Sequence, residues 1–409
     1  MCIKRIKYLV CATLVLCLIP CIVIAVNAPP PMTNFLPARE INPFPFDMYR
    51  ELASREGNIF FSPYSISAAL TMTYIGARGE TATEMANVLR FAGYEDRIHH
   101  VNWMFQNRFD DIPETQGIIE IANRLWLERS YELLPEFVTA VERHYGAGVE
   151  TVDFITATEE ARIIINNWVA ENTRDKIKDI LQQGDIDSLT RLVLTNAIYF
   201  NSNWLHQFDK AHTRDLPFYT GQNQYITTPM MSRTGSFRYS ENADLQWIKI
   251  PYTIPNLSML IFLPRENETF TQIGELENKL TSDYFLELIN QMVYTQISLS
   301  MPRFRDEQRY TLPAELSRLG MPLAFSGNAD FSGIFGSRDL FIGNVIHQSF
   351  IEVDEEGTEA AAATAVIISR TSMIIEDEPK VFNANRPFIY MLFDEITDVI
   401  LFMGRLERP

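Results

Sequence analysis

The chain has 409 residues, of which 46% are hydrophobic and 21% are charged, so it can bury a sizeable core and no long stretch has a disordered composition. Its formal net charge is −17, and no dense basic cluster lies beyond the first residues, so binding to nucleic acid or to heparin-like polyanions is disfavoured. All four cysteines lie within the first 21 residues, which excludes thiol catalysis and cysteine metal sites in the body of the protein.

The first 25 residues have the layout of a secretory signal peptide. Lys4, Arg5 and Lys7 precede an apolar run, Tyr8–Ile24. Cleavage after Ala25 leaves a mature chain with net charge −20, because three of the 35 basic residues are lost and none of the 52 acidic ones. The run, of about 17 residues, could instead be an uncleaved membrane anchor. Both alternatives send the body out of the cytosol, so we expect a secreted, extracellular protein, or a cell-surface one if the leader is retained.

Residues 26–40 hold a run of prolines and are expected to form an extended entry segment. No linker, repeat or low-complexity block interrupts residues 41–409, so we expect one domain. Helices are predicted at Ser62-Pro63 and beyond, over Leu133–Tyr145 and over Ala161–Leu181. Strands are predicted over Leu192–Phe200, Leu257–Leu263, Gln296–Met301, Phe388–Phe393 and Val399–Met403, the last two as a hairpin. Because helices and strands are partly segregated, the fold class is α+β.

No catalytic motif is evident. The chain has no Gly-x-Ser-x-Gly elbow and no His-Glu-x-x-His zinc motif. Gly146-Ala147-Gly148 lacks the third glycine of a dinucleotide loop and is interpreted as a turn. The pair His99-His100 is interpreted as solvated surface rather than as a metal site. His347, in an apolar stretch, is typical of a hydrogen-bonded core histidine. We therefore expect neither an enzyme nor a bound cofactor or metal.

Two sequons make the protein a candidate glycoprotein. They begin at Asn267, in a polar run, and at Asn256, which borders an apolar strand. Asn267 is the favoured site because a strand border is less accessible.

Several motifs occur in the order and at the intervals of one family. They are Asn58–Ile66, Asn123–Trp126, Val152–Phe154, Ile165–Val169, Thr195–Phe200 with Trp204 and Phe208 after it, Ala329–Ile334, Phe382–Phe388 and Leu401–Arg405. On these motifs the chain, from about residue 40 to Pro409, resembles the serpins, the serine protease inhibitor superfamily. Three departures occur: Ser202 stands where serpins usually carry Gly, Asn385 where Asp is common, and Thr253 where Gly often follows Pro251-Tyr252.

The resemblance implies a fold and a mechanism. The fold is a single domain with a large central, mostly antiparallel sheet, two further sheets, about eight or nine helices and an exposed reactive-centre loop at about 355–379. The mechanism is suicide inhibition: a protease cleaves the loop, an acyl-enzyme forms, and the loop inserts into the central sheet as a new strand, trapping the enzyme. The resemblance assigns the hinge of that loop to Glu355, Glu356, Gly357, Thr358, Glu359, Ala360, Ala361, Ala362 and Ala363.

The hinge sequence is compatible with insertion. Gly357 gives the backbone freedom, and strand side chains alternate between two faces. If Thr358 faces inward, Glu359 faces solvent. The side chains at the inward positions are then small or apolar and uncharged, as insertion requires, because a buried charge would be costly. These positions are Thr358, Ala360, Ala362, Thr364, Val366 and Ile368. This pattern favours an inhibitor over a non-inhibitory serpin acting as carrier or chaperone.

The bait lies at Arg370, Thr371 and Ser372. Family spacing places the cut about fourteen residues after Gly357, which makes Thr371 the residue before the scissile bond. Loops one residue shorter occur in the family, and Arg370 would pair with the Asp of a trypsin-like specificity pocket. We therefore predict cleavage at Arg370–Thr371 and a covalent complex with a trypsin-like serine protease. Cleavage at Thr371–Ser372 would indicate an elastase-like target, and a cysteine protease is a further alternative.

The resemblance also assigns a polar cluster beneath the insertion gap, termed the shutter, to Ser62, Ser65, Asn196 and His347. Its implied role is to hold the sheet closed yet openable by hydrogen bonds. The alternative is an ordinary set of satisfied core polar groups. We expect the protein to be a monomer.

Overall fold

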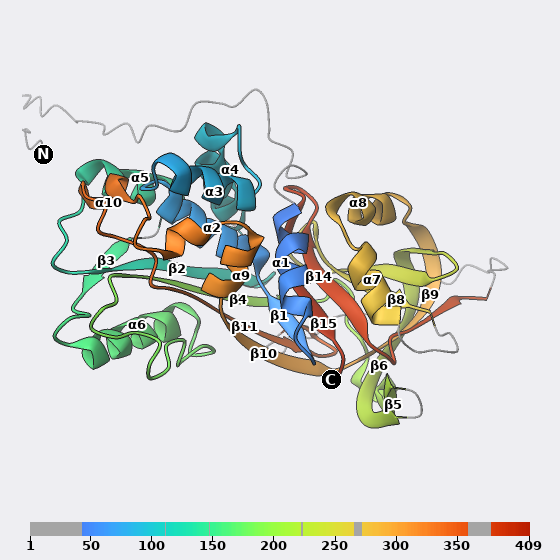
Figure 1. Ribbon diagram of the computed structural model, residues 1–409. Helices are drawn as coiled ribbons and strands as arrows, with labels where there is room; N and C mark the ends of the chain where they lie inside the picture. Colours follow the sequence, from blue (N-terminus) through green and yellow to red (C-terminus); the bar gives the residue numbers. More distant parts are fainter. Residues whose placement is uncertain (1–42, 111, 147, 222–223, 266–271, 359–377) are drawn as a thin grey trace, which may run out of the picture. The chain divides into compact units, whose positions relative to one another are not determined.

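A computed structural model of the protein describes residues 43–110, 112–146, 148–221, 224–265, 272–358 and 378–409 (Figure 1). All of them fall within one compact unit, and none of the helices they form is long and apolar enough to cross a bilayer. The leader, the entry segment, the hinge residues 359–363, the bait residues 370–372 and Asn267 lie outside the described residues.

A six-stranded sheet forms the centre of the fold. Its strand order is β10 (Phe304–Thr311), β11 (Asn344–Val353), β12 (Gly357–Thr358), β4 (Leu192–Asn203), β2 (Ile118–Glu128) and β3 (Val149–Val152). Neighbours are antiparallel except for β2 with β3 and for β11 with β4, which also pair directly. This is the large, mostly antiparallel sheet that the sequence predicts.

The second sheet has nine strands. Its order is β1 (Ile59–Phe61), β15 (Val399–Leu406), β14 (Phe388–Asp394), β8 (Leu257–Pro264), β7 (Leu245–Pro251), β6 (Gln224–Glu241), β9 (Val293–Pro302) and β13 (Lys380–Asn383), with β5 (Arg214–Gly221) paired to β6. The predicted C-terminal hairpin is confirmed as β14 and β15. The long β6 pairs with β5 at its start, with β9 along its middle and with β7 at its end, and so joins strands that could otherwise form separate sheets.

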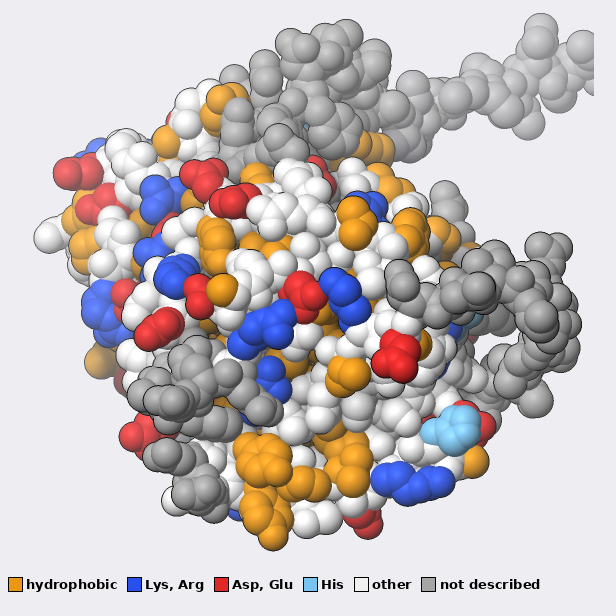
Figure 2. All heavy atoms as spheres, turned by 90° about the vertical axis from the view of Figure 1, so that its right-hand side faces the viewer, with side chains coloured by type: hydrophobic (Ala, Val, Ile, Leu, Met, Phe, Trp, Pro, Cys, Tyr) orange, Lys and Arg blue, Asp and Glu red, His pale blue; other side chains and the backbone are white. Residues whose placement is uncertain are grey.

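Ten α-helices occur among the described residues, and α+β is confirmed as the fold class. They are α1 (Pro43–Ala53), α2 (Pro63–Tyr74), α3 (Gly79–Val88), α4 (Glu95–Asp110), α5 (Pro135–Tyr145), α6 (Thr158–Asn172), α7 (Gln272–Lys279), α8 (Ser282–Asn290), α9 (Pro313–Leu319) and α10 (Ser332–Phe335); short 3₁₀ helices span Lys210–His212 and Pro322–Phe325. In Figure 1, α6 covers one face of the six-stranded sheet and α2 lies on the other. Figure 2 shows a second view, in which basic, acidic and apolar side chains are interspersed.

Helix ends follow local chemistry. Ser62 caps α2, accepting a hydrogen bond from the backbone N–H of Ser65 at 3.1 Å, so the predicted start is confirmed. Gly146, with φ of 58°, terminates α5 as the predicted turn. The helix predicted over Ala161–Leu181 is too long, because α6 ends at Asn172. Thr173 Oγ1 accepts a hydrogen bond from the N–H of Ile177. Arg174 and Asp175, which follow Thr173, have positive φ, and this conformation stops the helix.

The interpretation of His99-His100 as solvated surface is wrong for His99. This residue of α4 lies half-buried against α5, where its Nδ1 is 2.7 Å from the hydroxyl of Tyr145. Burial lowers the pKa of His99 to about 4, so the ring is neutral near pH 7. His100 stacks on Trp103. No group of three or more potential metal ligands occurs within the described ranges.

Candidate functional site: the hinge and the centre of the six-stranded sheet

The hinge enters the six-stranded sheet at one end. Gly357–Thr358 form the two-residue strand β12, and Thr358 pairs with Val353 of β11 on one side and with Ser202 of β4 on the other. Further along, β11 and β4 pair directly, residues 344–349 with residues 193–198. The sheet is therefore split at one end, and the hinge occupies the start of the split.

Thr358 faces the core. Its side chain is fully buried, and its hydroxyl lies 2.7 Å from the hydroxyl of Tyr252. Burial raises the pKa of Tyr252, so the phenol is protonated and can donate or accept in this bond. Thr358 therefore faces inward, which is the condition for the predicted alternation of core-facing and solvent-facing side chains along the inserted strand. The facing of positions 359–368 stays a prediction, because these residues lie outside the described ranges.

Gly357 is required by close approach. A Cβ built on it would lie 2.2 Å from the carbonyl oxygen of Ser202 and 2.5 Å from the Cα of Asn203, both backbone atoms that cannot move aside cheaply. The backbone angle φ of Gly357 is not positive, so the left-handed region that favours glycine is not used here. In this conformation the position needs glycine for its missing side chain, and the conformational freedom expected of Gly357 during insertion stays a prediction.

The turn before β12 is anchored by hydrogen bonds to its backbone carbonyls. Trp204 donates from its ring Nε1 to the carbonyl of Asp354 and from its backbone N–H to that of Glu356, both at 2.8 Å. The N–H of Phe208 donates to the carbonyl of Glu355 at 2.9 Å. Because β12 follows this turn directly, these bonds fix where the hinge meets the sheet.

Glu355 forms a buried ion pair that the sequence does not reveal. Its side chain is 1% exposed and accepts from Nε and Nη2 of Arg303 at 2.8 and 2.6 Å, and from the hydroxyl of Thr213. Burial acts to raise the pKa of Glu355, but the bonds from Arg303 and Thr213 outweigh it and the pKa is lowered. Oε2 has no hydrogen-bond partner among the described residues. The carboxylate thus holds the base of the hinge through one oxygen.

The four predicted shutter residues lie together. The N–H of Ser62 donates to His347 Nε2 at 2.9 Å, and His347 Nδ1 contacts Asn196 Oδ1. Asn196 Nδ2 donates to Ser65 Oγ at 2.6 Å. A fifth residue, Asn123, joins them, because its Oδ1 accepts from Ser65 Oγ at 2.8 Å and also from Asn196. Asn123 is the first residue of the motif Asn123–Trp126, so the sequence contained a signal from which this fifth member could have been predicted.

His347 is neutral, with a defined tautomer. Because Nε2 accepts from the N–H of Ser62, the ring proton resides on Nδ1 and is donated to Asn196. Burial lowers the pKa of His347 to about 3. The bond from His347 to Asn196 links β11 to β4 at residues that are directly paired, so it closes the sheet at the point where the split would have to extend.

Two of the departures from the family pattern contact each other. The hydroxyl of Ser202 donates to the carbonyl of Gln116 at 2.9 Å and lies 3.2 Å from the hydroxyl of Thr253. Thr253 Oγ1 also donates to the carbonyl of Gln116, at 2.5 Å. The two hydroxyls therefore share the carbonyl of Gln116 beside β12, and both also lie within hydrogen-bonding distance of the carbonyl of Asn203, at 3.5 and 3.1 Å. At the third departure, Asn385 Oδ1 accepts from Arg386 at 3.1 Å, so an oxygen acceptor is retained without the charge.

Asn256 is more accessible than the sequence indicates. Its side chain is exposed, and its φ of 62° places it in the turn before β8. The strand border therefore does not hide this sequon.

Comparison with known proteins gives one consistent result. The family described as Serpin (serine protease inhibitor) matches residues 39–409. The leukocyte elastase inhibitor of Xenopus tropicalis is 39% identical over 373 residues, covering 90% of this chain and 97% of that protein. An uncharacterised serpin-like protein of Thermococcus kodakarensis is 41% identical, covering 90% and 85%. Among solved structures, a highly specific serpin of the insect Tenebrio molitor has a TM-score of 0.81 at 30% identity, covering 90% and 97% of the two chains.

Proposed function

Because the chain belongs to the serpin family of serine protease inhibitors, we propose that it traps its target protease as a suicide substrate, by inserting the cleaved reactive-centre loop between β4 and β11. The observation that carries the proposal is β12. Thr358 is already paired on both sides and Gly357 is paired with β4, so insertion extends an existing strand and needs no new nucleus.

The register of β12 defines the inserted strand. If its antiparallel pairing with β4 were continued, residue 364 would stand opposite Asn196, and if its pairing with β11 were continued, the same residue would stand opposite His347. Asn196 and His347 are themselves partners in the closed sheet. The two registers therefore agree, and residues 362–367 would occupy the space between 193–198 and 344–349 without any shift of either strand.

Insertion has a defined polar cost. Separating β4 from β11 breaks their direct backbone pairing and the bond from His347 to Asn196. Thr364 would enter between these two side chains on the inward face, where its hydroxyl can donate and accept. The inserted strand would also restore the backbone ladder on both sides. Asn196 stays bonded to Ser65 and Asn123, so one partner is exchanged while the others hold.

We propose a trypsin-like serine protease as the target, with cleavage at Arg370–Thr371. An exposed Arg fits a specificity pocket that ends in Asp, through charge-assisted hydrogen bonds. The second candidate is an elastase-like protease cleaving at Thr371–Ser372. It is favoured by the names of similar proteins, which are leukocyte elastase inhibitors in frog, cattle and human, and by the fourteen-residue spacing from Gly357.

The two targets are distinguished by one experiment. The mature protein is incubated with trypsin and, separately, with elastase, and SDS-resistant complexes are sought on gels. Mass spectrometry of the released C-terminal fragment then identifies the cleaved bond. Arg370→Ala should abolish the trypsin complex, whereas Thr371→Ala should leave it. Cleavage by both enzymes without any complex would refute inhibition and favour a carrier or chaperone role.

We also propose that the protein is secreted and glycosylated. The proposal is supported by the leader pattern and by the exposure of Asn256. Expression in a eukaryotic secretory host, followed by N-terminal sequencing, should find a chain that starts after Ala25. Asn256→Gln and Asn267→Gln should each remove one glycan from the secreted protein. An intact leader on a membrane-bound product would indicate an anchor instead.

A further inference from the structure

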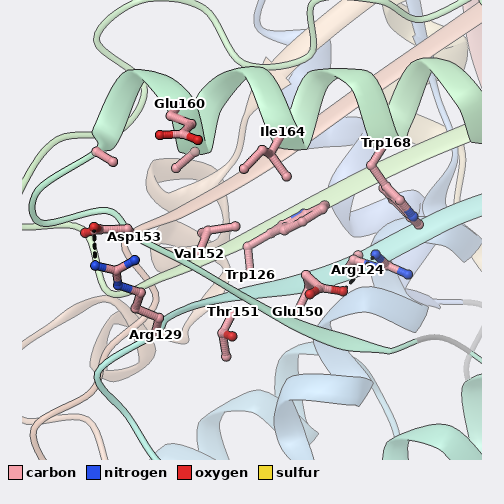
Figure 3. A pocket seen from close by; sticks show the side chains of 12 residues that line it. Arg124, Trp126, Arg129, Glu150, Thr151, Val152, Asp153, Glu160, Ile164 and Trp168 are labelled. Carbon is pink, nitrogen blue, oxygen red and sulfur yellow. Dashed lines mark hydrogen bonds and ion pairs between the residues drawn. The ribbon is translucent and has the colours of Figure 1, made fainter.

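A cavity of about 350 Å³ opens between α6 and the edge of the six-stranded sheet, where β2 and β3 lie. This volume is within the range of roughly 300–1,000 Å³ that holds small ligands. Figure 3 shows Ile164 and Trp168 reaching down from α6, with Trp126 of β2 lying below Ile164 and Arg124 lying below Trp168. The loop insertion proposed above uses none of these side chains directly.

Arg124 is held flat in this cavity by two aromatic rings. Its guanidinium carbon lies 4.1 Å from the ring centroid of Trp168 and 5.4 Å from that of Trp126. The two rings meet edge to face at 5.5 Å. A guanidinium held in this way by cation–π contacts is preorganised, so little side-chain entropy is lost when it binds an anion.

The hydrogen-bonding capacity of Arg124 is largely unused. A guanidinium carries five N–H donors. Among the described residues, the recorded bond of Arg124 runs to Glu150, at 3.4 Å, which is long for a charged pair, and Nε is buried with no partner. Glu150 is 52% exposed and can turn to solvent. A stacked, partly desolvated cation with unused donors favours an anionic ligand, because such a ligand would supply the missing acceptors.

Of the other lining residues, Glu160 and Thr151 are exposed, with Glu160 on α6 at the end away from Arg124 (Figure 3), and the remaining side chains are apolar or already paired. Trp126 donates its Nε1 proton to Thr195 Oγ1 at 2.7 Å, so the ring surface is what it offers a ligand. Val152 is buried beside it, and Ile164 is 45% exposed at the mouth although it is a large apolar side chain. At the far end, Arg129 and Asp153 form an ion pair of 2.8 Å and need no further partner.

We propose that this cavity binds a small planar aromatic monoanion. Its carboxylate or sulfonate would bond to Arg124, displacing Glu150, and its ring would pack against Trp168, Trp126 and Ile164. A flat ring suits the site because the walls are themselves flat rings and a flat guanidinium, and a single negative charge matches the one cation that lacks good acceptors.

The cavity is placed to affect loop insertion, an effect that rests on the proposed function. The helix α6 contacts β2 through Trp168 and Trp126. The segment after α6 is tied to β10 on the other side of the split, since Arg309 Nε donates to the carbonyl of Ile180 at 2.7 Å. Helix and segment together thus bridge the two halves of the sheet that insertion must separate. A ligand that fixes α6 to β2 and β3 in the closed sheet should slow insertion.

The binding test uses 2-naphthoate as the probe, titrated into the full mature chain by calorimetry. We expect binding of 2-naphthoate and, because the amide lacks the charge, binding of 2-naphthamide that is weaker by about tenfold or more. Arg124→Gln and Ile164→Glu should each lower the affinity by a similar factor. Ile164 is half-exposed, so Ile164→Glu should fold even if Arg124→Gln does not. Arg305→Gln is the matched control, because Arg305 also stacks on an aromatic ring, Phe350, at 4.9 Å, but does not line the cavity.

The outcomes separate the site from its effect. Absence of 2-naphthoate binding, or binding that neither Arg124→Gln nor Ile164→Glu weakens, would overturn the site. Saturating 2-naphthoate should also raise the number of inhibitor molecules consumed per protease inactivated, and only in chains that keep Arg124. Binding without this rise would overturn the effect on insertion and leave the site standing. A protein that binds 2-naphthoate but forms no protease complex would refute the proposed function alone.

Discussion

Replacing Thr358 by Arg should convert the protein from an inhibitor into a substrate. Thr358 is fully buried between β11 and β4, and its hydroxyl bonds to Tyr252. A guanidinium at this position must either be buried without a partner or expel β12 from the sheet. Both outcomes oppose insertion, because the inserted strand begins here.

The magnitude follows from the difference between the costs of these two outcomes. An unpaired buried charge costs about 3–5 kcal/mol. Expelling β12 instead loses its ladder contacts and the bond to Tyr252, each about 1 kcal/mol. The intact variant adopts the cheaper outcome, and if the transition state for insertion requires residue 358 in the sheet, the barrier rises by the difference between the two costs. That difference is up to about 2 kcal/mol, so insertion slows up to roughly 30-fold. The acyl-enzyme then hydrolyses before it is trapped.

The assay measures how many inhibitor molecules are consumed per protease inactivated, with SDS gels to separate complex from cleaved product. Thr358→Arg should give cleaved product almost alone. Thr358→Val is the matched control: it keeps an apolar, β-branched side chain, loses the bond to Tyr252 at about 1 kcal/mol, and should inhibit nearly as the wild type does. Equal consumption by Thr358→Arg and the wild type would refute the reasoning, since the hinge would then not need to enter the sheet.

Three further predictions concern stability. Since the pKa of His347 falls from 6.5 to about 3 on folding, its contribution to stability is present above pH 6.5 and is lost as pH falls towards 3. Denaturant unfolding between pH 6 and 4 should show the wild type losing about 1.4 kcal/mol of unfolding free energy per pH unit more than His347→Gln. Parallel curves of stability against pH for the two proteins would contradict this. Gly357→Ala should lower the free energy of unfolding, measured by thermal unfolding, by about 1–3 kcal/mol. Gly274→Ala, in α7 with open space around it, should not lower it. Equal stability changes in the two variants would contradict the close approach at Gly357. Glu355→Gln and Arg303→Gln should each lower the free energy of unfolding by about 1 kcal/mol, a value limited by the 41% exposure of the Arg303 side chain. The double variant should lose less than the sum of the two single losses. Full additivity would argue against an interaction between Glu355 and Arg303.

The polar cluster at the centre of the sheet is largely predictable from sequence because all of its residues except His347 lie within a quoted motif. Ser62 and Ser65 stand in the segment entering α2, and Asn196 stands in the strand motif of β4. The strands of the central sheet are also predictable, because buried strands have continuous apolar runs. Such patterns report burial, and burial is what these positions share.

The anchoring of the hinge is not predictable in the same way. Arg303 lies 52 positions from Glu355, in no recognisable motif, so only the folded chain reveals the pair. The end of α6 depends on the Oγ1 of Thr173 accepting a backbone bond, a local competition that apolar periodicity does not register. For Gly357 the residue type is evident, but the neighbouring backbone that demands it belongs to β4.

The hydroxyls of Ser202 and Thr253 have a consequence for how this sequence could have evolved. Because they share the carbonyl of Gln116 and touch each other, the gain from either one depends on whether the other is present. In a lineage with glycine at both positions, the first hydroxyl would have the Gln116 carbonyl to itself and the second would share it, so the two gains would not add. The two positions are therefore best treated as one coupled character: a descendant that reverts one to glycine changes what the other contributes.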